Sequence, residues 1–453
     1  LRESDALNAL ELRAALALAS VYVLRMMGLF MVMPVLAVAA MDYPDYSPLL
    51  VGLAVGGYGL TQAALQIPMG MMSDKWGRKP VILFGLAVFA FGSFVAANAD
   101  TMAWLIVGRI LQGAGAIAGA IMALAGDVSR EQQRPKVMAI IGIAIGFSFY
   151  IALLIGPVIA DSYGLHGIFS ITGMLALLCI PLVIWVVPSA INYAPKGDTL
   201  PVLTDVKILF FDPQLRRLNI SVMLLHMMIT VLFVQMPILL SALGWQLENH
   251  WQLYLPILAA SVVGLVALMM LTKKMSQAGV IRLCILLLGG ALLGLHFSHS
   301  TVLAVMVFGW LFFTGFNFLE ASFPAMVSSI APAGKKGSAM GIYASFQFLG
   351  AFLGGTLSGL ASQYIGPQWV FVIAGGACGI WWLGLRKLGT SERLKRFTLK
   401  PDFTRYSADT IGEQLATLEG VVDVTVVPDE GVVYIKADGK QFSLEKAHLL
   451  VNG

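Results

Sequence analysis

The chain has 453 residues, of which 58% are hydrophobic and only 12% are charged. Soluble globular proteins carry about 25% charged residues, and the mean hydropathy here is +0.82, so the composition excludes a soluble protein and predicts an integral membrane protein. The formal net charge of +4 is small and concentrated in a few connections, which argues against a nucleic-acid-binding surface.

Apolar runs long enough to cross a bilayer, about 20 residues each, recur along the chain as far as residue 385. Backbone groups in lipid find no water, so each run is predicted to be a helix. Twelve runs are predicted, and they begin near Ala14, Leu49, Val81, Met102, Val137, Ile168, Leu218, Leu253, Ile281, Val302, Ser338 and Trp369. A polar stretch separates the first six from the last six. The predicted units are residues 1–187, a central linker 188–217, residues 218–387 and a tail 388–453.

Positive charges are distributed unevenly between the connections. The even-numbered connections carry Lys75, Arg78 and Lys79, then Arg130, Arg134 and Lys136, then Lys207, Arg216 and Arg217, then Lys273 and Lys274, then Lys335 and Lys336. The odd-numbered connections carry neither Lys nor Arg. Lys and Arg gather on the cytoplasmic side of membrane proteins, so both termini are predicted to be cytoplasmic.

The connection after the second run carries the most specific motif. Residues 70–79 read Gly-Met-Met-Ser-Asp-Lys-Trp-Gly-Arg-Lys, which resembles without substitution the signature loop of the major facilitator superfamily, Gly-x-x-x-Asp-(Arg/Lys)-x-Gly-Arg-(Arg/Lys). A solvated basic loop, the alternative, explains the cations but not the Gly/Asp/Gly/Arg spacing. The resemblance implies two six-helix halves with a binding site between them near the bilayer midplane.

The same resemblance implies that the loop is a conformational latch. In the superfamily the loop arginine pairs with an acidic residue that closes the fourth span, and the loop aspartate approaches the start of the eleventh helix. The residues that match these roles are Gly70, Asp74, Gly77, Arg78 and Asp127. Aligning position 77 with position 279 places Asp74 opposite Ser276 and Arg78 opposite Val280, so the second half repeats the topology without the charged motif.

Two further motifs resemble those of twelve-span drug/proton antiporters. The fourth run contains Arg109 followed by Gln112 and Gly113, and the family arginine at this point is associated with proton transfer. An arginine at a helix centre costs about 2.5 to 3.5 kcal/mol, so Arg109 is predicted to face a partner or a wet cavity, with snorkelling to the outer interface as the alternative. In the fifth run, Gly156 and Pro157 partly match the antiporter motif and predict a helix kink.

Glu320 is the leading candidate for proton coupling. It lies inside the tenth run, with Asn317 one turn earlier on the same face, where a carboxyl is costly unless it is protonated or paired. Two roles stay open: a proton carrier, or a fixed partner of Arg25 or Arg109. Arg25 in the first run is a structural cation or a substrate-site cation, and His226 in the seventh run either titrates or holds a structural hydrogen bond.

The tail is soluble in character. Residues 389–396 are predicted to be a basic connector on the anionic inner leaflet. Ser407 is predicted to cap a helix that ends at Gly420, followed by a strand of alternating valines, a turn at 428–431, a strand Val433–Ala437 and a helix 444–450. This β-α-β-β-α order resembles a small α+β ferredoxin-like domain of the heavy-metal-associated type. It lacks that family's Cys-x-x-Cys, so we expect no metal site.

Together the family resemblances imply a secondary active transporter of the bacterial inner (plasma) membrane, with proton-coupled efflux by alternating access. We expect its partners to be protons, the lipid bilayer and a small amphipathic or apolar molecule, with no nucleic acid and no cofactor, and we expect a monomer. The alternative is a transporter-derived sensor whose cytoplasmic domain reports conformation or ligand. We expect no enzymatic activity, because no nucleophile, base and orienting group occur at a recognisable spacing.

Overall fold

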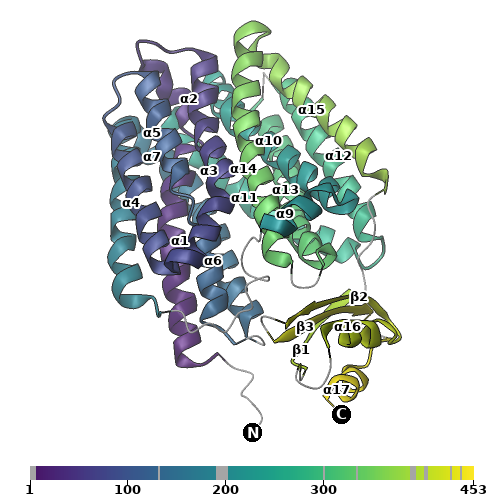
Figure 1. Cartoon of the computed structure of the whole chain (residues 1–453). Helices are drawn as coiled ribbons and strands as arrows, with labels where there is room; N and C mark the ends of the chain where they lie inside the picture. The colour runs from purple at the N-terminus through teal and green to yellow at the C-terminus, as the bar shows by residue number, and fades with distance from the viewer. Residues whose placement is uncertain are drawn as a thin grey trace.

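The computed structural model describes residues 7–130, 133–189, 203–298, 301–332, 335–387, 394–401, 403, 407–428, 431–438 and 441–452. Long helices form a bundle, and a small sheet domain lies beyond one end of it (Figure 1). The first helix begins at that same end, which we call the tail end; the opposite end is the far end. Residues 190–202 of the predicted central linker, 388–393 of the predicted connector and 429–430 of the predicted turn lie outside the described residues.

The helices of the first half begin close to the predicted positions. They are α1 (Ala9–Val32), α2 (Leu36–Ala39), α3 (Pro48–Trp76), α4 (Arg78–Ala97), α5 (Met102–Ala114), α6 (Ala118–Asp127) and α7 (Arg134–Pro181), with a π-helical turn η2 (Leu182–Val186) after it. Local chemistry sets several of these ends. The Ser47 side chain caps α3 and Thr101 caps α5, while Gly77, at φ 94°, makes the turn between α3 and α4.

Two of the predicted runs are interrupted. The first span changes direction at residues 33–35, where Pro34 separates α1 from α2. The fourth span, predicted as one helix, is broken at residues 115–117 between α5 and α6. The predicted fifth and sixth runs are continuous in α7 except at Gly164, whose φ of 62° and ψ of −167° are not helical.

The second half repeats this pattern. Its helices are α9 (Leu203–Phe211), α10 (Pro213–Ala242), α11 (Trp251–Leu271), α12 (Gln277–His296), α13 (Val302–Ile330), α14 (Lys336–Tyr364) and α15 (Pro367–Gly384), with short turns η1 (Ala40–Asp42), η3 (Leu247–Asn249) and η4 (Leu385–Lys387) elsewhere in the chain. Asp212 caps α10 by accepting hydrogen bonds from the backbone N–H groups of Gln214 and Leu215, and Pro213 occupies the first turn.

Ten helices within the described residues are long and apolar enough to cross a membrane. One of them, Lys136–Val186, has 51 residues and is long enough for two passes at about 1.5 Å per residue. The 18-residue α15, where the twelfth run was predicted, is not among the ten. The protein is therefore a mostly helical, multi-pass membrane protein, and the count of twelve spans stays a prediction.

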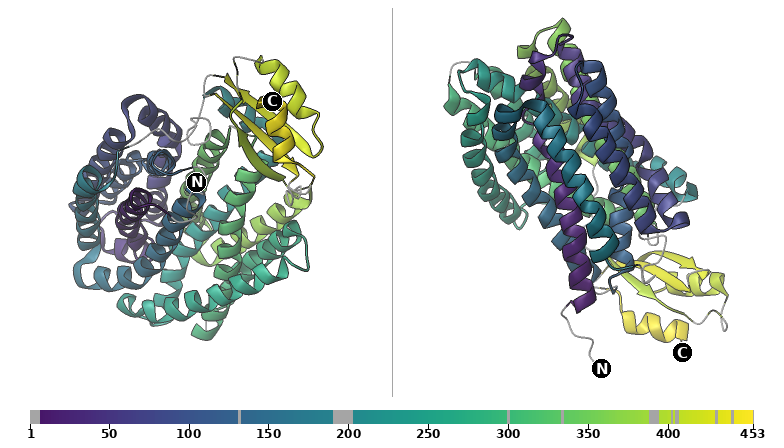
Figure 2. Two further views of the ribbon diagram at one scale, coloured as in Figure 1. Left: turned by 90° about the horizontal axis from the view of Figure 1, so that it is seen from below. Right: turned by 90° about the vertical axis from the view of Figure 1, so that its left-hand side faces the viewer.

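The two halves meet through glycines at the far end of the bundle. The beginning of α3 packs against the end of α14 so closely that a Cβ atom at Gly56 would lie 2.7 Å from the Phe352 carbonyl oxygen, and one at Gly359 would lie 2.6 Å from the Pro48 carbonyl oxygen. Gly52 would clash with Gly355 in the same way. Figure 2 shows the two helix groups side by side. Only residues without a side chain allow this approach of two backbones.

The tail contains β1 (Leu394–Leu399), α16 (Ala408–Ala416), β2 (Val421–Val427), β3 (Val432–Asp438) and α17 (Leu444–Asn452). The strands form one antiparallel sheet in the order β1-β3-β2. Ile411 and Leu415 of α16 pack with Val433 and Ile435 of β3 in a separate small core. The predicted element order is observed, but residues 394–396 belong to β1 and not to a connector on the membrane, because they pair with β3. The ferredoxin-like assignment itself stays a prediction.

Candidate functional site

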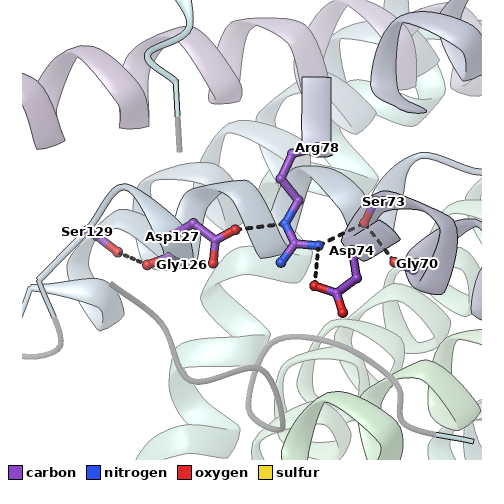
Figure 3. A network of polar contacts seen from close by, with 7 residues as sticks. All are labelled: Gly70, Ser73, Asp74, Arg78, Gly126, Asp127 and Ser129. Atoms are coloured by element: carbon purple, nitrogen blue, oxygen red, sulfur yellow. Dashed lines mark hydrogen bonds and ion pairs between the residues drawn. The ribbon is translucent and has the colours of Figure 1, made fainter. Parts of the chain in front are cut away.

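Arg78 in the signature loop is held by two carboxylates. Its Nε donates to Asp127 Oδ2 at 2.7 Å, and one terminal nitrogen lies 3.8 Å from Asp74 Oδ1 and 3.2 Å from Ser73 Oγ. The side chains of Arg78 and Asp127 are 9% and 4% exposed. Figure 3 shows the three elements that contribute: the end of α3, the start of α4 and the end of α6. The predicted Arg78–Asp127 pair is thus present in the structure.

Gly70 and Gly77 complete this loop. Ser73 Oγ donates to the Gly70 carbonyl at 2.7 Å, which fixes the last turn of α3, and Gly77 supplies the left-handed backbone between the helices. The described contact of Asp74 is with Arg78, within the first half. Its predicted approach to the start of the eleventh helix, here α14, stays a prediction.

Arg109 lies deep in the first half and does not snorkel, because only 1% of the residue is exposed. Its guanidinium donates to the Ala54 carbonyl at 2.9 Å, to the Val55 carbonyl at 3.3 Å and to Gln112 Oε1 at 2.8 Å. It also lies over the ring of Tyr58, 5.4 Å from the centroid. These contacts satisfy the cation with neutral acceptors.

Arg25 is equally buried, at 1% exposure. It donates to the Gly115 carbonyl at 2.9 Å and lies 3.5 Å from Gln62 Oε1, with its guanidinium 4.9 Å from the centroid of Phe89. Gly115 stands at the break between α5 and α6, so Arg25 satisfies a carbonyl that the break leaves without its helical donor. Neither buried arginine contacts Glu320 among the described side chains, so the predicted fixed pairing of Glu320 with Arg25 or Arg109 is not observed.

Glu320 instead meets His226 and Gln347. Glu320 Oε2 lies 3.6 Å from His226 Nε2, and the Gln347 carboxamide nitrogen is 2.8 Å from the same His226 Nε2 and 3.4 Å from Glu320 Oε1. The Glu320 side chain is 38% exposed as a whole, yet its Oε2 atom is buried and has no hydrogen-bond partner. The Tyr343 hydroxyl interacts electrostatically with Glu320 and is also buried without a hydrogen bond. These side chains come from α10, α13 and α14.

Asn317 shows which way this face of α13 is turned. Its amide nitrogen donates to Ser261 Oγ at 3.0 Å and to the hydroxyl of Tyr150 at 3.1 Å. Tyr150 belongs to α7 of the first half, and Asn317 and Glu320 share one face of α13 because they are three residues apart. The face that carries Glu320 is therefore the face that α13 turns toward the first half.

Aromatic rings connect this cluster to the first half. Consecutive ring centroids lie 5.0 to 6.5 Å apart along the series Phe30, Phe149, Phe233, Phe313, Phe316 and His226. The series crosses from α1 and α7 to α10 and α13. Phe233 and Phe313 are fully buried, whereas Phe30 and Phe149 are partly exposed. A continuous series of aromatic rings thus leads from His226, beside Glu320, to partly exposed rings of the first half.

Gly156 and Pro157 lie inside α7. A Cβ at Gly156 would stand 2.6 Å from the Met31 carbonyl oxygen, so this glycine lets α1 and α7 approach closely. Within α7 the backbone leaves helical geometry at Gly164, seven positions after Pro157. The described residues contain no group of three or more His, Cys, Asp or Glu side chains that could hold a metal ion.

Sequence reasoning missed four residues of the site: Gln347, Tyr343, Tyr150 and Gln62. They are neutral and lie on three different helices. A signal existed for Gln62 and Gln347, because an amide inside an apolar run needs a partner. The partner of each glutamine depends on how the helices pack, and the spacing of residues along the sequence does not predict it.

A family model described as "Major Facilitator Superfamily" matches residues 18–355 and, in a second overlapping match, residues 220–408. The chain belongs to this superfamily. As a superfamily member it is a multi-pass membrane transporter, of the secondary type by its fold, and the family binds small-molecule substrates.

The chain is similar to the inner membrane transport protein YajR of Escherichia coli (strain K12), with 37% identity over 96% of this chain and 97% of that protein. It is also similar to an uncharacterized transporter of Buchnera aphidicola subsp. Schizaphis graminum (strain Sg), with 33% identity over 83% of this chain and 97% of the relative. Among solved structures, a D-xylose-proton symporter has a TM-score of 0.68 at 14% identity and covers 85% of this chain and 99% of its own; this likeness concerns the fold alone. The relatives are named as transporters, which gives the sensor alternative no support.

Proposed function

We propose that this superfamily member is a proton-coupled exporter in a bacterial inner membrane, with Glu320 as the coupling carboxyl. One observation carries the proposal: Glu320 Oε2 is buried in a spanning helix without a hydrogen-bond donor, 3.6 Å from a histidine nitrogen. An ionised carboxylate in this position leaves a charged oxygen unpaired, whereas a protonated carboxyl carries its own donor. The site is therefore built to bind a proton and to release it.

The surroundings of Glu320 indicate how a proton is exchanged for cargo. The Glu320 side chain is 38% exposed and lies on the face that α13 turns toward the first half, and the aromatic series that begins beside His226 leads to the partly exposed rings of Phe149 and Phe30. An amphipathic or apolar molecule that fills this aromatic surface would displace water from the carboxyl and change the free energy of its ionised form. One pH unit across the membrane supplies about 1.4 kcal/mol per proton, and 100 mV supplies about 2.3 kcal/mol per charge.

Several finer assignments belong to the same proposal. We infer twelve spans, by counting Lys136–Val186 as two helices broken at Gly164 and α15 as the last. The positive connections support cytoplasmic termini, and with that orientation the glycine contact between α3 and α14 lies at the outer side. The order of strands and helices in the tail supports a ferredoxin-like domain.

Flux measurements in proteoliposomes test the coupling. The purified protein is reconstituted with a pH dye inside the vesicles, and ethidium, a fluorescent amphipathic cation, serves as the transported probe. We expect ethidium movement to accelerate with an imposed pH gradient and to be accompanied by proton movement in the opposite direction. Equal ethidium rates with and without the gradient, at matched membrane potential, would contradict the proposal.

A further inference from the structure

His226 Nε2 is approached by two groups at once. The Gln347 carboxamide nitrogen lies 2.8 Å away and Glu320 Oε2 lies 3.6 Å away. The other ring nitrogen, Nδ1, lies 3.2 Å from the Val222 carbonyl, which can only accept a hydrogen bond. Nδ1 therefore carries a hydrogen, and in the neutral ring Nε2 then offers a single lone pair.

One lone pair cannot accept hydrogen bonds from both neighbours. When Gln347 donates to neutral His226, Glu320 Oε2 is left without a donor, which is the arrangement observed. When a proton enters the pair, Nε2–H or a Glu320 hydroxyl lies between His226 and Glu320. The Gln347 nitrogen must then leave Nε2, because Nε2 is a donor in the first case and its single lone pair is taken by the Glu320 hydroxyl in the second.

Rotation of the Gln347 carboxamide by 180° resolves this conflict. It exchanges the amide nitrogen for the amide oxygen, which accepts from a protonated histidine. The proton state of the pair thereby sets the orientation of Gln347. No other group that changes charge touches the pair among the described contacts, since the remaining neighbours are the Tyr343 hydroxyl, the Phe316 ring and the Thr230 hydroxyl bonded to the His226 carbonyl.

Gln347 sits on the helix that closes the far end. The next residue, Phe348, packs its ring on Tyr58 of α3 at 5.9 Å between centroids, and its carbonyl lies against Gly59. Gln347 therefore immediately precedes the part of α14 that contacts α3. A change in the hydrogen bonds of Gln347 is transmitted directly to this contact.

We propose that Gln347 is the positioning residue that couples the proton state of the His226–Glu320 pair to α14. It stabilises the proton-free state by donating to both partners and opposes the proton-loaded state until its carboxamide rotates. This inference rests on the proposed function, because it takes Glu320 and His226 as the proton site.

The test is a pH titration of conformation that needs no substrate. Spin labels are attached to cysteines at Leu12, near the start of α1 in the first half, and at Lys274, in the connection between α11 and α12 of the second half, with the three native cysteines replaced. The distance between the labels is measured in full-length protein in lipid nanodiscs from pH 5 to 9. We compare wild type with Gln347→Met, which keeps the shape of the side chain but removes both donors, and with Gln347→Asn, whose amide is one methylene too short.

In the wild type we expect the distance distribution to change with pH, with a single midpoint. Both variants should move that midpoint upward by about half to one pH unit, because they remove the Gln347 hydrogen bonds to His226 and Glu320 that favour the proton-free state. Gln252→Met, at an exposed amide on α11, is the matched control and should leave the midpoint unchanged. Thermal unfolding of each variant shows whether it is correctly folded. Two different substitutions are made at position 347 so that the test still works if one of the two variants is unstable.

Glu320→Gln, in the same labelled protein, separates the two proposals. If the wild-type midpoint is lost in Glu320→Gln but is unchanged in both Gln347 variants, the role of Gln347 is overturned and the proton site stands. If the wild type does not respond to pH, or Glu320→Gln titrates like the wild type, the proton site is overturned and the role of Gln347 with it. A lowered transport level with an unmoved midpoint indicates a merely structural Gln347 and also overturns the inference.

Discussion

The two halves share a topology but use their buried polar residues in opposite ways. The first half buries Arg25 and Arg109 and gives their guanidinium groups carbonyl, amide and aromatic partners, although Arg25 Nε has no hydrogen-bond partner. The second half places Glu320 beside His226 and leaves a carboxyl oxygen without a donor. A guanidinium keeps its charge at any physiological pH, whereas a carboxyl and an imidazole can change theirs. The two buried arginines of the first half are therefore fixed cations with neutral partners, whereas Glu320 and His226 of the second half are groups that can gain or lose a proton.

The equivalent loops differ in the same way. In the first half the turn between α3 and α4 is held by the Arg78–Asp127 ion pair. At the aligned position in the second half, Ser276 caps α12: its hydroxyl oxygen accepts one hydrogen bond from the Gly279 N–H, at 3.2 Å. Both halves thus have a helix boundary at this position, but the Arg78–Asp127 ion pair is present in the first half alone.

The largest effect is expected from Glu320→Gln. Gln matches the carboxyl in size and can keep neutral hydrogen bonds, but it cannot bind and release a proton, so flux driven by a pH gradient should be abolished. The free energy of unfolding should change little, because the partner left behind is a histidine that can be neutral. The measurements are ΔpH-driven transport and thermal unfolding of the same preparation.

Two results would contradict the proposed difference between the two halves. Wild-type transport by Glu320→Gln would exclude this carboxyl as the coupling site. A loss of about 3 to 5 kcal/mol in stability, the cost of breaking a buried ion pair, would make Glu320 a fixed structural partner like the arginines of the first half.

The second prediction compares the loops directly. Asp127→Asn removes the buried partner of Arg78 and should lower the free energy of unfolding by about 3 kcal/mol, the lower end for a broken buried pair, because Asp74 and Ser73 still contact the guanidinium. Ser276→Ala in the second half should cost about 1 kcal/mol, as for the loss of a helix cap. Denaturant unfolding in detergent measures both. Equal losses would show that the two loops are energetically alike.

A smaller effect is expected from Asp74→Asn. The Asp74 side chain is 38% exposed, so its ion pair with Arg78 contributes at most about 1 kcal/mol. If the loop is a latch, the substitution also removes the predicted interaction of the Asp74 carboxylate with the N-terminus of α14, about 0.3 to 1 kcal/mol. The resting population should then shift toward inward-facing states by up to about fivefold, since 1.4 kcal/mol is a factor of ten. Spin-label distances across the tail end measure the shift, with Asp100→Asn at the far end as the control. An unchanged distribution would remove the latch role of Asp74.

The smallest effect is expected from removing the tail, which belongs to neither half. Ile411, Leu415, Val433 and Ile435 form a core of their own, so ending the chain after Gly389 should leave a folded, membrane-inserted body with an unchanged unfolding temperature. Size-exclusion profiles and thermal unfolding of the truncated and full-length proteins check this. Aggregation of the truncated chain alone would make the tail a structural part of the transporter.

The amino-acid sequence predicted those features that depend on neighbouring residues, such as helix starts and the residues that share a helix face. Helix starts near Leu49, Met102 and Val302 follow from apolar runs and were found within one residue. The Arg78–Asp127 pair followed from a family motif, and the shared face of Asn317 and Glu320 followed from helical spacing.

What the pattern did not show depends on contacts between distant segments. The break at residues 115–117 lies in an apolar run that reads as one helix, and it is stabilised from outside by the Arg25 guanidinium. The partnership of His226 with Gln347 joins residues 121 positions apart. Periodicity places each side chain on a face, but only packing decides which faces meet.

The contact between Arg25 and Gly115 also has a consequence for how the protein enters its membrane. The two residues are 90 positions apart, so the first span leaves the insertion machinery before its acceptor on the fourth span has been made. An arginine near the middle of a lone helix raises the free energy of insertion by about 2.5 to 3.5 kcal/mol. The remaining apolar residues of α1 must outweigh that cost until α5 arrives, and the first four spans are then expected to assemble as one cohort rather than one at a time.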